Sequence, residues 1–283
     1  MSDAVVHNSL RHRASKHAFN AWLAVGVGLL LLLQLSGCAN SLRSVEPSGP
    51  DMTTDSDEAP ARKRARTRLE LAVNYFDQGQ TRVALDEVKQ SLNQDPNYAD
   101  AMNLRGLIYM RLGDTRLAEE SFKQALVVSP RDGNTLHNYG WLLCQQARYT
   151  DAGTAFAQAL SSAAYRDRAK TFMAQGLCEE RAGRQADAEH SLAKSYELDP
   201  GNPITGFNLA NLLLKRGDLV RAQFYVRRLN NSEFANSESL WLGIKIERKL
   251  ESRDAMRQLV DQLSKRFAQS KEMQLYEKGS FDD

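Results

Sequence analysis

The sequence predicts an all-α protein, a superhelical solenoid of about six helix–turn–helix repeats. Its prolines mark the period, because Pro96 and Pro130 close two similar segments 34 residues apart and Pro200 closes another. A small residue also recurs 12 positions before an alanine, as Gly106 does before Ala118. The same interval separates Ala72 from Ala84, Gly140 from Ala152, Gly176 from Ala188, Ala210 from Ala222 and Gly243 from Ala255. Good helix formers are abundant, whereas the alternating Val, Ile and Thr of strands are absent.

Residues 1–37 have the layout of a secretory signal peptide. Basic residues precede an apolar run at 21–35, and small residues then lead to Cys38. An uncleaved membrane anchor is the alternative, but the run is shorter than the about 20 residues that a spanning helix needs.

The stretch Leu35-Ser36-Gly37-Cys38 resembles the lipobox of bacterial lipoproteins. That resemblance implies cleavage before Cys38 and lipidation of this cysteine. Ala39 stands where an aspartate would favour retention in the inner membrane, so the resemblance implies a lipid-anchored protein on the periplasmic face of the outer membrane. Residues 38–60 are rich in Pro, Ser, Gly and Asp, which predicts a disordered tether behind the lipidated cysteine.

The repeat domain is expected over residues 61–270, followed by a C-terminal tail at 271–283. Its units are 65–98, 99–132, 133–168, 169–202, 203–235 and 236–269. Gly113 and its counterparts Gly79, Gly183 and Gly217 are predicted to end the first helix of their units. With a small residue and an aromatic on the first helix, Ala-x3-Phe on the second and a closing proline, the pattern resembles the tetratricopeptide repeat. The third unit departs from it with two extra residues and Ala164, the fifth has Phe234 near the proline place, and the sixth is the weakest match.

This resemblance implies a protein-binding inner face made mainly by the first helices. Its candidate contacts are Asn103, His137, Asn138, Trp141, Lys170, Arg181, Phe207, Asn208 and Asn211. Amide side chains can bond the backbone of an extended peptide while the aromatic rings supply apolar contact. Each residue taken alone has an equally good explanation as an ordinary core or solvated position. A carboxylate clamp is not expected, because Phe207 stands where such a clamp would need lysine.

Composition and motifs argue against catalysis and against nucleic acid. Removal of residues 1–37 leaves 34 basic and 34 acidic residues, so net charge favours no nucleic-acid partner. No nucleophile elbow, phosphate loop or zinc signature occurs, so we expect no enzyme activity, no cofactor, no metal and no small-molecule substrate. The basic run 62–68 is interpreted as the solvated start of a helix, with contact to anionic lipid as the alternative. Cys144 and Cys178 are interpreted as small buried side chains, although an oxidising compartment would permit a bridge.

Two segments, NYGWLLCQQARYTDA at 138–152 and LDPGNPITGFNLANLLLKRGDLVRA at 198–222, resemble the PilF/PilW family of type IV pilus biogenesis lipoproteins. The family resemblance implies a pilotin, which brings secretin subunits to the outer membrane and helps them form a ring. Two other functions stay open: regulation of a periplasmic cell-wall synthase, and scaffolding of an envelope export complex.

Overall fold

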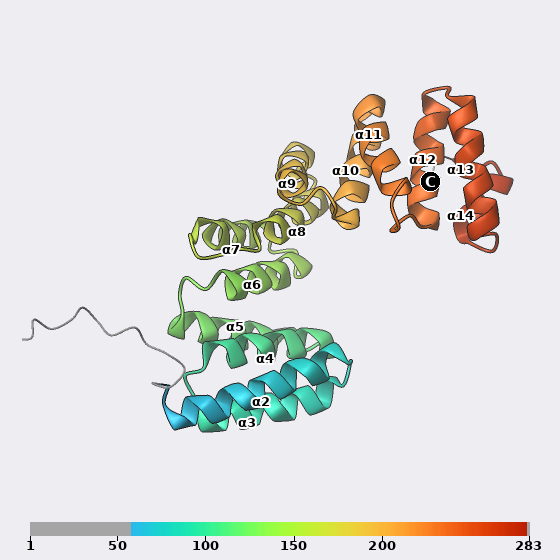
Figure 1. Cartoon of the computed structure of the whole chain (residues 1–283). Coiled ribbons are helices and arrows are strands. Elements are labelled where there is room, and N and C mark those ends of the chain that lie inside the picture. The colour runs from blue at the N-terminus through green and yellow to red at the C-terminus, as the bar shows by residue number, and fades with distance from the viewer. Residues whose placement is uncertain (1–57, 282–283) are drawn as a thin grey trace, which may run out of the picture. The chain divides into compact units, whose positions relative to one another are not determined.

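The structure, a computed structural model, describes residues 58–281. The expected signal peptide, Cys38 and nearly all of the expected tether lie outside the described residues. Within 58–281 the chain forms 13 helices and no strand, so the predicted all-α repeat architecture is confirmed (Figure 1). No helix in this described part is long and apolar enough to cross a membrane.

The helices form six consecutive antiparallel pairs followed by one short helix. They are α2 (Pro60–Asp77), α3 (Thr81–Gln94), α4 (Ala99–Leu112), α5 (Thr115–Val128), α6 (Gly133–Gln145), α7 (Tyr149–Ser161), α8 (Arg168–Arg181), α9 (Gln185–Leu198), α10 (Pro203–Arg216), α11 (Leu219–Asn230), α12 (Ser237–Lys249), α13 (Arg253–Arg266) and α14 (Lys271–Glu277). The first helix, α2, begins five residues before the first expected unit. Pro60 suits this start, because a residue in the first turn of a helix needs no N–H for an intrahelical hydrogen bond.

Small residues allow the two helices of each pair to approach closely. A Cβ atom added at Gly106 would lie 2.4 Å from the ring of Phe122, and one at Gly140 would lie 2.8 Å from the ring of Phe156. Both phenylalanines are fully buried. The glycine on the first helix and the phenylalanine on the second therefore interlock, which is the physical basis of the repeat spacing.

The first helix of most units ends in a left-handed residue. Gly113 has φ +80°, and Gly79, Gly183 and Gly217 have similar positive values, so the predicted helix ends are confirmed. In the third and sixth units the same role falls to Ala147 and Glu251, at φ 59° and 57°. In the second and fifth units the next helix begins at an aspartate, Asp114 or Asp218; the carboxylate of Asp114 accepts a hydrogen bond from the backbone N–H of Leu117 at 2.9 Å.

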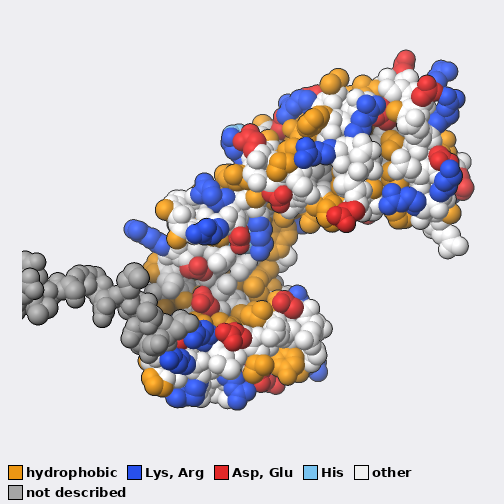
Figure 2. Space-filling model, in the orientation of Figure 1, with side chains coloured by type: hydrophobic (Ala, Val, Ile, Leu, Met, Phe, Trp, Pro, Cys, Tyr) orange, Lys and Arg blue, Asp and Glu red, His pale blue; other side chains and the backbone are white. Residues whose placement is uncertain are grey.

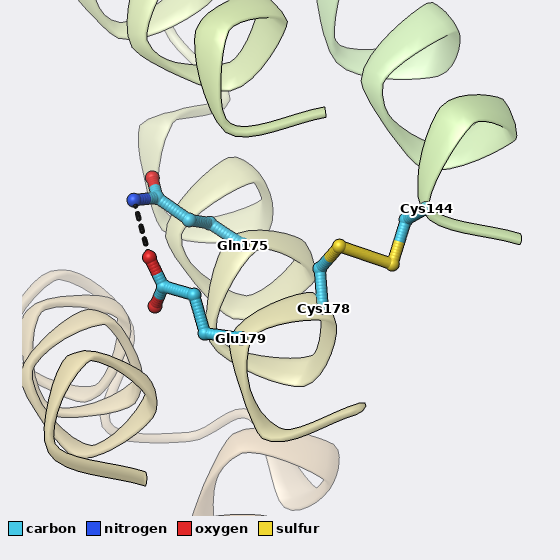
Figure 3. Close-up of a disulfide and its surroundings, with 4 residues drawn as sticks. All are labelled: Cys144, Gln175, Cys178 and Glu179. Atoms are coloured by element: carbon cyan, nitrogen blue, oxygen red, sulfur yellow. Dashed lines mark hydrogen bonds between the residues drawn. A yellow bond between two sulfur atoms is a disulfide. The ribbon is translucent and has the colours of Figure 1, made fainter. Parts of the chain in front are cut away.

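A disulfide joins Cys144 at the end of α6 to Cys178 on α8, with their Cα atoms 5.7 Å apart (Figure 3). Our interpretation of these residues as separate buried thiols is therefore wrong, although both side chains are buried. They are separated by 34 residues, but the third unit is 36 residues long, so Cys144 lies four residues after Gly140 whereas Cys178 lies two residues after Gly176 on the next first helix. The bridge thus links the third and fourth units covalently.

The expected tail contains structure that the sequence pattern did not predict. Helix α14 packs against α12, and its Met273, Leu275 and Tyr276 cover the apolar cluster around Leu240 and Ile244. It lies where the first helix of a seventh unit would begin, so it covers the apolar end of the array.

Candidate functional site

The first helices of neighbouring units pack against each other: α2 with α4, α4 with α6, α6 with α8, and α10 with α12. The second helices instead pack against the first helix of the same and the following unit. The first helices therefore line the inner side of the curved array, as expected for a solenoid of helical pairs. We call the surface carried by α4, α6, α8 and α10 the A-helix face. Over the whole face of the molecule drawn in Figure 2, charges of both signs are spread among hydrophobic side chains.

Two of the predicted asparagines meet across a unit boundary on this face. The side-chain N–H of Asn138 on α6 donates to the side-chain oxygen of Asn103 on α4 at 3.0 Å. Both side chains remain partly exposed. Each amide has further donor or acceptor capacity, so the pair can offer hydrogen bonds to the backbone of an extended peptide.

Trp141 and Arg181 form a cation–π pair on the A-helix face. The guanidinium of Arg181 on α8 lies 4.9 Å from the centre of the Trp141 ring on α6. Trp141 is half-buried against the cluster that contains the disulfide, and Arg181 is exposed. A bound peptide could therefore gain apolar contact from the indole and charge from the guanidinium at one place.

His137 does not belong to the accessible face, so its prediction as a partner contact is wrong. Its side chain is only 6 % exposed, and Nδ1 lies 2.8 Å from the hydroxyl of Thr171. That hydroxyl is also 2.6 Å from the hydroxyl of Tyr165. Burial, helped by the positive charge of Lys170, lowers the pKa of His137 to about 4, so the ring is neutral at physiological pH.

The extra residues of the third unit explain the buried hydrogen-bonded row of His137, Thr171 and Tyr165. They carry Tyr165 into the core, where a Cβ at Gly133 would lie 2.4 Å from its ring. A cavity of about 690 Å³ opens beside it, between the loop before α6 and the loop before α8. Its lining is Ser129, Pro130, Arg131, Asp132, Gly133, Asn134, Ser162, Ala164, Tyr165, Arg166 and Asp167. Sequence reasoning noted the irregular length of this unit but did not predict the cavity.

The remaining candidates lie on α8 and α10. Lys170 is exposed in the first turn of α8. Phe207 packs partly buried against the core of the fifth unit, and Asn208 donates to the backbone oxygen of Ile204 at 2.8 Å, which uses part of its capacity. Asn211 is partly exposed one turn further along.

Cations recur at one place on the first helices, five residues after the small residue of the unit. This basic row consists of Arg111, Arg181, Lys215 and Arg248. Arg111 lies 3.6 Å from the ring centre of Phe76, and the ammonium of Lys215 lies 2.8 Å from the carboxylate of Glu180. Sequence reasoning did not extend the face to the sixth unit, where Trp241 and Arg248 continue it; the repeat spacing alone would have found Arg248.

The chemistry available on the A-helix face is recognition. It presents amides, rings and cations, which are groups suited to binding a peptide segment. Within residues 58–281, no three His, Cys, Asp or Glu side chains are grouped to hold a metal ion.

Comparison with known proteins agrees with this geometry. The tetratricopeptide repeat family matches residues 69–135 and 137–203. The chain is 28 % identical over 248 residues to the type IV pilus assembly protein PilF of Pseudomonas aeruginosa, a match that covers 88 % of this chain and 95 % of PilF.

Two solved structures are similar along most of the repeat array. The structure of P. aeruginosa PilF has a TM-score of 0.71 and 26 % identity, covering 78 % of this chain and all of that one. The structure of PilW, described as a widely conserved type IV pilus biogenesis factor, has a TM-score of 0.68 and 28 % identity, covering 75 % of this chain and 97 % of that one. The chain is therefore an all-α tetratricopeptide-repeat protein, homologous to PilF and built like PilF and PilW.

Proposed function

We propose that this protein is an outer-membrane lipoprotein of type IV pilus biogenesis that acts as a pilotin. It binds secretin subunits through the A-helix face and promotes their localisation and assembly into a ring. The observation that carries the proposal is the homology to PilF, which extends over 88 % of this chain and 95 % of that protein. The protein acts as a scaffold and not as an enzyme.

The site supports this function through its exposed groups. Asn103 and Asn138 can bond the backbone of an extended segment, while Trp141 and Arg181 anchor a side chain of that segment. The disulfide lies directly beneath this region, because Cys144 is three residues after Trp141 and Cys178 is three residues before Arg181. It therefore keeps α6 and α8 in register, and a preformed surface loses less conformational entropy on binding.

The lipid anchor supplies the rest of the mechanism. A lipid on Cys38 would confine the protein to the membrane, and the tether expected behind it would, as a random coil, have a root-mean-square reach of roughly 25 Å. Secretin subunits held within that reach experience a raised effective concentration, so ring assembly is accelerated without any chemical step.

The test is complementation of a deletion strain of the source bacterium. Wild-type protein should restore secretin multimers in the outer-membrane fraction, measured by immunoblot of unheated samples. Cys38→Ala should leave the multimers few or misplaced because the lipid is lost. Trp141→Ala should reduce them while the protein itself stays at normal abundance. Phe224→Ala is the matched control, because Phe224 is 59 % exposed on the second helix α11, away from the A-helix face.

Normal secretin multimers in the deletion strain would refute the proposed function. A deletion that instead changes cell-wall synthesis, with twitching motility intact, would favour regulation of a cell-wall synthase.

A further inference from the structure

A small pocket opens beside α11, between the loop that precedes α10 and the loop that precedes α12. We call it the α11 pocket; its volume is about 210 Å³, and its walls include Tyr196, Pro200, Pro203, Tyr225, Arg228 and Phe234. The lining contains one cation and no carboxylate. The pocket is therefore positively charged and has largely aromatic walls.

Three aromatic rings shape the α11 pocket. Tyr196 in the last turn of α9 meets Tyr225 on α11 edge-on, with ring centroids 4.8 Å apart, so each ring holds the other in place. Phe234, in the loop before α12, is 50 % exposed. An apolar side chain placed against Phe234 and the two prolines would bury apolar surface that this chain leaves open.

Arg228 supplies the positive charge of the pocket. Its side chain is exposed, and its guanidinium lies 5.9 Å from the ring centre of Tyr196. Among the described residues no carboxylate pairs with it. The neighbouring Arg227, by contrast, binds the buried carboxylate of Glu247 at 2.7 Å. Arg228 is therefore available to an anion from outside the chain.

The hydroxyl of Tyr196 is buried, and no group of the described residues forms a hydrogen bond with it. Other buried or half-buried tyrosines are paired: the hydroxyl of Tyr165 lies 2.6 Å from that of Thr171, and the hydroxyl of Tyr139 donates to Glu119 at 3.1 Å.

The unpaired hydroxyl acts as a donor. Burial raises the pKa of Tyr196, with Arg228 opposing this effect and Tyr225 adding to it, so the hydroxyl keeps its proton at physiological pH. Because the exposed Arg228 side chain lies over the ring, its movement can let an acceptor oxygen approach the hydroxyl. A carboxylate accepts from a phenol and from a guanidinium at once.

The backbone of the two loops leaves recognition to the side chains. The side chain of Asn202 accepts hydrogen bonds from the N–H groups of Ile204 and Thr205 at 3.0 and 3.1 Å. The N–H of Phe234 donates to the hydroxyl of Ser232 at 3.2 Å. Capture of a C-terminal carboxylate commonly uses free backbone N–H groups, so the pocket suits a side-chain carboxylate better.

We propose that the α11 pocket binds the side-chain carboxylate of an internal Asp or Glu of a partner protein, with a neighbouring apolar residue of that protein packed against Phe234. The carboxylate pairs with Arg228 and accepts the hydrogen bond of Tyr196. The volume matches side chains rather than a whole small molecule, whose pockets span about 300–1,000 Å³. This surface is separate from Trp141 and Asn138, so the proposal holds whichever protein the A-helix face binds.

The first arm of the test measures stability. Tyr196→Phe removes only the hydroxyl, and because that hydroxyl has no partner in the free protein, the thermal midpoint should stay the same or rise. Tyr165→Phe is the matched control and should lower the midpoint, since its hydroxyl is bonded to Thr171. A fall for Tyr196→Phe as large as that for Tyr165→Phe would overturn the proposal, because the hydroxyl would then be bonded within the chain.

The second arm measures binding to the full chain in detergent by fluorescence anisotropy. The probes are fluorescein-labelled peptides Gly-Ser-X-Glu-X-Ser-Gly with amidated C-termini, in which X is Phe, Tyr, Leu or Pro. At least one should bind wild type, and its binding should weaken as salt is raised. Replacing Glu by Gln in the peptide, or Arg228→Gln in the protein, should weaken binding about tenfold. Tyr196→Phe should weaken it several-fold, whereas Arg116→Gln, on the exposed surface of α5, should leave it unchanged.

No binding by any of these peptides, equal binding of the Gln peptides, or binding that survives Arg228→Gln would overturn the proposal. So would tighter binding of a Gln peptide with a free C-terminal carboxylate, which would mean C-terminal capture. Peptide binding that is lost in Trp141→Ala would place the peptides on the A-helix face and would also overturn it. None of these outcomes bears on secretin assembly, which the complementation experiment tests separately.

Discussion

Single glycines on the first helices decide how closely a pair can pack. At Gly106 there is no room for a methyl group, because the Phe122 ring lies 2.4 Å from the position a Cβ would take and is itself fully buried. We predict that Gly106→Ala lowers the free energy of unfolding by about 1–3 kcal/mol. Gly153 in α7 is the control, since nothing lies within 4 Å of its Cβ position. There alanine should be neutral or stabilising by up to about 1 kcal/mol. Urea denaturation measures both, and equal effects at the two sites would contradict the packing.

His137 makes stability depend on pH. Its folded-state pKa is about 4 against an ordinary value of 6.5, so the unfolded chain binds more protons between these values. Stability is therefore complete above pH 6.5 and falls as pH drops towards 4, by about 3 kcal/mol in all. Thermal melts from pH 7.5 to 4 should show this loss in wild type and a smaller loss in His137→Gln.

Glu119 affects only the acid end of that experiment, below about pH 4.5. Burial raises its pKa, but hydrogen bonds from Lys123 and Arg148 outweigh burial and lower the pKa to about 2. Its contribution is present above pH 4.5 and is lost below that value. A wild-type pH profile that is flat between 6.5 and 4 would contradict the buried, neutral His137.

Residues that follow the repeat were predictable from the sequence, and residues that break it were not. The spacing identified Gly106 as the small residue of a helix pair and Gly113 as the end of a first helix, because both features depend only on contacts within one unit. It misplaced His137, since the burial of that ring depends on Tyr165, which the irregular third unit carries into the core. A pattern taken from regular repeats contains no information about such an insertion.

The helix pair is the unit of stability, and one covalent link joins two such pairs. We predict that Cys144→Ser with Cys178→Ser lowers the free energy of unfolding by about 2–4 kcal/mol, as expected for a closed loop of this length. Guanidinium denaturation of wild type with and without reductant provides the control, since reductant should weaken wild type and leave the double variant unchanged. A wild-type midpoint insensitive to complete reduction would contradict a structural bridge.

At the level of helices, the sequence predicted the six pairs but neither the bridge nor α14. The sequence permitted the bridge but did not place it, because the 36-residue third unit leaves Cys144 four residues after Gly140 and Cys178 only two residues after Gly176. Helix α14 could not have been predicted either, because it has seven residues and carries no repeat motif. Its apolar side chains can be identified as core residues only from their packing against α12. The basic run was interpreted correctly as part of a helix, and there Arg62 pairs with Asp95 and Arg68 with Glu87.

The whole molecule presents a chain of similar surfaces with different side chains on each unit. This arrangement suits a protein that grips an extended partner at several points, because no single unit has to provide all the affinity. The homology to PilF indicates a protein of type IV pilus biogenesis. Secretin as its partner is our proposal, because no single residue of this chain identifies the target.

The central claim is that the A-helix face binds secretin subunits, and direct capture tests it best. Immobilised wild-type protein should retain secretin from detergent-solubilised membranes, and Phe224→Ala should retain the same amount. Trp141→Ala, with an unchanged thermal midpoint, should retain several-fold less. Equal retention by all three proteins would show that secretin does not bind at Trp141, and no retention by wild type would contradict the claim as a whole.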